Sequence, residues 1–60
     1  MNYTIELERY DKTIEKHIKS TEQIEARSFG NDTLTVTFYD DNENSVAMFP
    51  IFDIISIKSN

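Results

Sequence analysis

Hydrophobic and polar residues alternate most regularly in the second half of the chain. Leu34, Val36 and Phe38 are separated by threonines, and this period of two predicts a half-buried β-strand over 34–39. The run that follows, 40–44, reads Asp-Asp-Asn-Glu-Asn. Such short polar side chains bond to their own backbone and favour turns, so a turn is expected there.

Two more strands are predicted after this turn. The first covers 45–49 and ends at Pro50, which has no backbone N–H for a sheet ladder. The second covers 54–58 and is rich in isoleucine. Upstream, weak alternation and a Gly-Asn-Asp turn predict a hairpin over 23–39.

Residues 3–20 carry two competing patterns. The segment 3–7 alternates as a strand, and 10–13 would then be a turn. A helix over 4–19 would instead place four apolar residues on one stripe, at Leu7, Tyr10, Ile14 and Ile18.

An internal similarity favours the strand. At an offset of 31 positions, 3–7 aligns with 34–38, so each half would be strand, turn, strand, corner, strand. The further matches are Ile14 with Val46 and 24–26 with 55–57.

The sequence therefore predicts one all-β domain over 1–60. We expect a small antiparallel sheet or incomplete barrel of about six short strands, built as two three-strand halves. The alternative is an α+β fold, with an N-terminal helix over 4–19 on a four-stranded antiparallel sheet. The residues expected to be buried are Leu7, Val36, Phe38, Val46, Met48 and Ile57, with Phe49 and Phe52 also assigned to the core.

Composition limits how such a fold is stabilised. A 60-residue chain buries only about 60% of its unfolded surface, and this one has no Cys for a disulfide or a thiolate zinc site. Self-association or docking on a partner is the remaining route to stability. We therefore expect a protein that is not a free monomer.

Charge and hydropathy bear on partners and location. The net charge is −5, and the acids dominate in residues 31–60, so direct nucleic-acid binding is disfavoured. No apolar run approaches the roughly 20 residues of a membrane span, and the N-terminus lacks the features of a secretory signal. A cytoplasmic location with no membrane partner is expected. The Gly-poor, Asn-, Lys- and Ile-rich composition is typical of an AT-rich genome, which suggests a phage or mobile-element accessory protein.

No residue pattern points to catalysis, a cofactor or a metal. His17 is the one conventional general base, and its neighbours along the chain provide no nucleophile. The segment 40–44 begins like a calcium loop, but Ser45 and Ile51 stand where that loop requires Gly and Glu. We expect a protein that is not an enzyme and has no cofactor.

The functional expectation is a small non-enzymatic protein-interaction module, contacting a second copy of itself or another protein. The alternative is an acidic inhibitor that mimics DNA. The candidate contact residues lie in three places. They are a tyrosine that does not follow the apolar alternation of its strand, the acidic residues of the turn, and the first residue of the last strand, in which 54–57 carry no charge. They are Tyr39, Asp40, Asp41, Glu43 and Ile54.

Overall fold

The computed structural model describes all 60 residues and contains six strands and one short 3₁₀ helix. The elements are β1 (Asn2–Asp11), β2 (Lys16–Glu25), β3 (Ser28–Asn31), β4 (Thr35–Tyr39), β5 (Ser45–Pro50), η1 (Ile51–Asp53) and β6 (Ile54–Ser59). The all-β prediction is confirmed, and the α+β alternative is wrong because 4–19 forms two strands and a turn. Period-two burial of Tyr3 and Ile5 outweighs the helical stripe.

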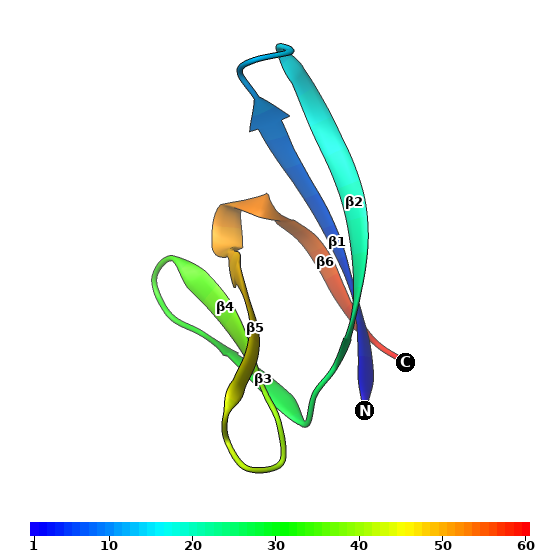
Figure 1. Ribbon diagram of the computed structural model, residues 1–60, viewed down its shortest axis with the longest axis vertical. Helices are drawn as coiled ribbons and strands as arrows, with labels where there is room; N and C mark the ends of the chain where they lie inside the picture. Colours follow the sequence, from blue (N-terminus) through cyan, green and yellow to red (C-terminus); the bar gives the residue numbers. More distant parts are fainter.

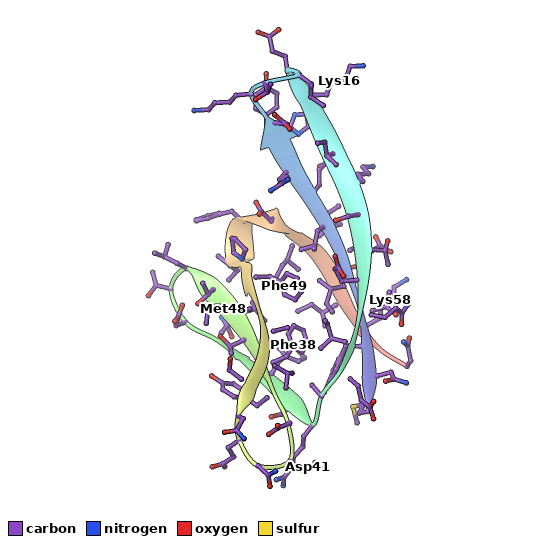
Figure 2. The ribbon with its side chains drawn as sticks, in the orientation of Figure 1. Lys16, Phe38, Asp41, Met48, Phe49 and Lys58 are labelled. Carbon is purple, nitrogen blue, oxygen red and sulfur yellow. The ribbon has the colours of Figure 1, made fainter.

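The strands form two three-stranded antiparallel sheets, with orders β2-β1-β6 (sheet A) and β3-β4-β5 (sheet B) (Figure 1). The core lies where β1 faces β4. Figure 2 shows Phe38 and Phe49 in this space between the sheets. The fully packed residues are few: Tyr3, Ile5, Ala26, Val36 and Phe38.

Each half of the chain contributes to both sheets. The first half is β1, β2 and β3, and the second half is β4, β5 and β6, as the internal similarity predicts. The two halves exchange their third strands: β6 pairs with β1, and β3 pairs with β4. β1 and β4 are therefore the corresponding central strands of two sheets with the same topology.

Backbone hydrogen bonds establish this equivalence. Ala26 N donates to Met1 O (3.0 Å), and at the matching place Ile51 N donates to Leu34 O (2.8 Å). A second matching pair is Asn60 N to Asn2 O (2.8 Å) and Asp32 N to Thr35 O (3.0 Å). Both pairs place β1 over β4 at an offset of 33 residues.

The predicted offset of 31 residues is therefore two residues too small, which is one side-chain period of a strand. Because the error is two residues, inward-facing positions were still matched with inward-facing positions. The other predicted matches fail: Ile14 lies in the turn between β1 and β2, and 24–26 is the end of β2 and the corner before β3.

The prediction for the core is half right. Val36 and Phe38 are buried, and Leu7 and Ile57 are half-buried against them. Of the remaining predicted core residues, Val46, Met48 and Phe52 are exposed.

The register of β5 explains the first two errors. Ala47 lies opposite Phe38 and Phe49 opposite Val36, so the odd-numbered residues of β5 face the core and Met48 faces outward. Phe49 is half-buried against the core, as expected. Phe52 is exposed because it belongs to η1, outside the strand pattern.

An aspartate orders the start of each hairpin turn. Asp11 Oδ1 accepts a hydrogen bond from Thr13 N (2.8 Å), and the turn covers 12–15 rather than 10–13. Asp32 and Asp40 act in the same way at the turns that precede and follow β4. The predicted hairpin over 23–39 begins later, at β3, because the chain bends at 26–27.

The molecule is elongated, with extents of 40 × 24 × 14 Å. Its radius of gyration is 12.4 Å, against roughly 10 Å for a compact domain of this length. The outer part of the β1–β2 hairpin, 8–19, causes this shape because it extends beyond the rest of the molecule (Figure 1). We call it the distal hairpin.

Candidate interaction surfaces

The acidic loop between β4 and β5 is ordered by its own first residue. Asp40 Oδ1 accepts hydrogen bonds from Asn42 N and Asn44 N (both 2.9 Å), so this carboxylate is engaged within the loop. Glu43 has a φ of 64°, in the left-handed region. The carboxylates left for a partner are those of Asp41 and Glu43.

Four of the five predicted contact residues meet around this loop. Tyr39 and Glu43 line a hollow of about 320 Å³ with Ser28. Asp40 and Asp41 line another, of about 230 Å³, on the side of the β2–β3 corner. Tyr39 itself is half-buried.

Ile54 lies apart from the loop. It is half-buried against the core and pairs with Leu7 at the start of β6. Its neighbour Ile55 is the exposed residue of this segment.

The largest hollow is a groove of about 420 Å³, which sequence reasoning missed. We call it the inter-sheet groove. Its hairpin wall comes from β1 and β2 and consists of Leu7, Arg9, Ile18, Ser20 and Glu22. Its opposite wall comes from β5 and η1 and consists of Phe49, Pro50 and Asp53.

The pairing of β1 with β2 explains the hairpin wall. Ile18 lies opposite Arg9, and Ser20 lies opposite Leu7, on the face of sheet A that carries the core. Sheet B covers this face near Ile5 but does not extend along the distal hairpin. The groove is therefore the open continuation of the hydrophobic core.

Charge is distributed along the long axis. Four of the six basic residues lie on the distal hairpin, and the acidic loop lies at the opposite end; Lys16 and Asp41 mark these ends in Figure 2. The four are Arg9, Lys12, Lys16 and Lys19. The distal hairpin also carries Glu8, Asp11 and Glu15, so its net charge is only +1, in contrast to the acidic loop at the other end.

The free edges of the sheets differ in how they are protected. Pro50 lies on the free side of β5, where its missing N–H costs no ladder bond and blocks strand addition. β2 carries charged side chains along its length, which also discourage pairing. β6 has only Lys58.

The β6 edge is nevertheless short. Asn60 N donates to Asn2 O, so by antiparallel alternation the backbone groups of Ile57 and Ser59 face away from β1. A register shift then leaves Ile55 as an extra residue between Ile54 and Ser56. The regular part of the free edge of β6 is therefore limited to the outward-facing backbone groups of Ile57 and Ser59.

The titratable groups form no concentrated centre. His17 lies on the outer face of the distal hairpin, with its ring 5.1 Å from the ring of Tyr10. No group of three or more His, Asp or Glu side chains is placed to hold a metal ion.

Asp32 is the one group with a displaced pKa. Hydrogen bonds from the backbone N–H groups of Leu34 (3.0 Å) and Thr35 (2.9 Å), and from the Thr35 hydroxyl (3.0 Å), lower its pKa from 3.8. This carboxylate closes the β3–β4 turn and therefore has a structural role.

Comparison with known proteins found no match among family models, curated proteins or solved structures. None of the helical segments is long and apolar enough to cross a membrane. Any function must accordingly be argued from the surfaces described above.

Proposed function

We propose that this chain is a small non-enzymatic protein-interaction module that self-associates. The observation that carries the proposal is the imbalance between buried and exposed apolar residues. Five residues are buried, whereas nine large hydrophobic side chains are exposed. Scattered exposed hydrophobics are ordinary in any protein, but so many in so small a chain indicate surface that is covered in use.

The exposed area supports the same conclusion. The chain exposes 4610 Å², against roughly 4,000 Å² for a compact monomer of its mass. The distal hairpin contributes to this area, because none of its residues is buried and sheet B leaves its core-facing side open. A partner that covers this surface adds the burial that a 60-residue chain without disulfides lacks.

The alternative of a DNA mimic is less well supported. A mimic needs carboxylates arrayed over one face, whereas on the distal hairpin the three acidic residues alternate with four of the six basic residues of the chain. Asp32 and Asp40 also use their carboxylates within turns. The charge pattern suits an interface with paired opposite charges better than an imitation of a phosphate backbone.

The test is the mass in solution, measured by light scattering during gel filtration at tens of micromolar. We expect a mass near twice 7.0 kDa, falling toward 7.0 kDa on dilution. Far-UV circular dichroism on the same fractions verifies that the chain is folded in both states. A folded species of 7.0 kDa throughout the concentration range would contradict the proposal.

A further inference from the structure

The distal hairpin is where the correspondence between the two halves of the chain ends. β1 and β2 have 10 residues each, whereas their counterparts β4 and β5 have 5 and 6. The extra length forms a two-stranded ribbon, which is marginally stable in water without a further layer on its apolar face. On that face, the ribbon presents Arg9 and Ile18 to the inter-sheet groove.

η1, which contributes Asp53 to the opposite wall of the groove, also carries an unusually exposed aromatic residue outside the groove. Phe52 is 84% exposed, more than any other large hydrophobic side chain in the chain. It is held in η1, which starts after Pro50 and ends where the N–H of Ile54 bonds to Ile51 O. Phe52 is therefore presented on an ordered turn, directly beside the groove residue Asp53.

We propose that a second copy of the chain closes the groove, with Phe52 of each copy inserted into the groove of the other. This rests on the proposed self-association and locates its interface. Leu7, Ile18 and Phe49 supply apolar walls for the ring. Asp53 of one copy then pairs with Arg9 of its partner.

Charge complementarity favours a second copy over another occupant. Arg9 lies on the hairpin wall and Asp53 on the η1 wall, so each copy offers both members of the pair on one surface. A two-fold axis needs this self-complementarity, because each patch must meet its own image. Glu22 is the other charged residue of the groove, and its carboxylate would repel Asp53 of the second copy. The β1–β2 register places Glu22 opposite Ile5, away from the Arg9 end of the groove.

Pairing through the β6 edge is the competing arrangement. The register shift at Ile55 shortens that edge, and it would leave both Phe52 and the distal hairpin uncovered. The groove arrangement covers both. The two interfaces use different residues and can be tested separately.

The experiment measures the dimer dissociation constant by sedimentation equilibrium for the parent and for six variants. Phe52→Ser should weaken the dimer by at least about thirtyfold, as expected for a central aromatic anchor. Ile55→Ser is the matched control, an exposed hydrophobic residue outside the groove, and should change it by less than threefold. Amide NMR spectra establish that each variant is folded.

The proposed pair of Arg9 and Asp53 provides an independent test of the interface. Arg9→Glu and Asp53→Arg should each weaken the dimer about tenfold or more, because each places like charges together across the interface. The double variant Arg9→Glu/Asp53→Arg should recover most of the affinity. Recovery shows that the two charges interact, which a general loss of stability would not produce. Because both residues line the groove of one copy, recovery when the two single variants are mixed is what requires them to meet between copies.

The outcomes separate this inference from the proposed function. A dimer that survives Phe52→Ser, or a charge reversal without recovery, overturns the groove interface and leaves self-association standing. Ser59→Pro removes a free N–H of β6, so its dissociation of the dimer would assign the interface to that edge instead. A folded parent that is monomeric at every concentration overturns both.

Discussion

Replacing Phe38 by alanine is expected to remove most of the stability of the fold. Phe38 is fully buried, and its ring lies 5.3 Å from Tyr3, 5.3 Å from Phe29 and 6.0 Å from Phe49, centre to centre. Truncating a buried Phe costs about 3–5 kcal/mol through lost burial and the cavity that remains. A 60-residue domain has a total stability of about 3–9 kcal/mol. Phe38→Ala should therefore leave a large unfolded fraction at 25 °C.

Urea unfolding followed by circular dichroism measures this effect at a fixed protein concentration. Phe38→Leu keeps the site apolar while losing the three ring contacts, and should cost about 2 kcal/mol, which can be measured even if the alanine variant does not fold. Met48→Ala is the matched control on β5. Because Met48 is 60% exposed, its truncation should change stability by less than about 0.5 kcal/mol.

The comparison tests the strand register as well as the core. In the structure Ala47 faces Phe38, so Met48 lies on the outer face of sheet B. If Met48→Ala were as damaging as Phe38→Leu, β5 would have to be turned by one residue. A Phe38→Ala variant as stable as the parent would refute the placement of the core between β1 and β4.

Two further predictions concern turns. Glu43→Gly should raise stability by about 1 kcal/mol, because Glu43 has a φ of 64° and glycine adopts this conformation without strain; a lower melting temperature than the parent would contradict this. Asp32→Asn should flatten the loss of stability in acid. Since the folded pKa of Asp32 lies below 3.8, its carboxylate stabilises the fold above that pH, and this contribution disappears as pH falls through the folded pKa. Parallel urea midpoints for the parent and Asp32→Asn between pH 5 and pH 2 would show that folding does not lower the pKa of Asp32.

The strands could be predicted from the sequence because the alternation of apolar and polar side chains along a strand is visible in the local sequence. Alternation around Val36 and Phe38 identified β4 and its inward face, and the acidic run identified the following turn. The direction of β5 could not be predicted in the same way. Its segment has apolar residues on both faces, so pairing with β4, and not composition, decides that Ala47 faces inward and Met48 outward.

The exchange of third strands was beyond sequence reasoning for a similar reason. Each half has the order strand, turn, strand, corner, strand, and no local sequence pattern determines which sheet its last strand joins. β3 and β6 cross to the opposite sheet through long-range pairing, as in Ile5 with Ile57. Phe52 was misassigned because hydrophobicity predicts burial only where a strand or helix turns the residue toward the core.

The prediction of candidate contacts emphasised the acidic loop and the start of β6, and it missed the groove. Tyr39, Asp41 and Glu43 do lie together around one end of the molecule. The groove instead joins Ile18 to Phe49, which are far apart in sequence and share no motif. One sequence signal was available, the concentration of basic residues over 9–19, but averaging charge over half the chain concealed it.

The proposed association would be coupled to stability, because the core and the groove use the same apolar face of sheet A. Near Tyr3 and Ile5, sheet B covers that face and forms the core; beyond Leu7, the same face continues into the open groove. A partner in the groove therefore extends the core instead of adding a separate contact, and mass action should make the thermal midpoint rise with protein concentration. This is why core variants must be compared at one concentration, and why a variant such as Phe52→Ser should lower the midpoint only where the parent is dimeric. The length of β1 and β2 beyond their counterparts thus has a physical consequence: it leaves an apolar face of the distal hairpin open, and the proposed second copy would cover that face.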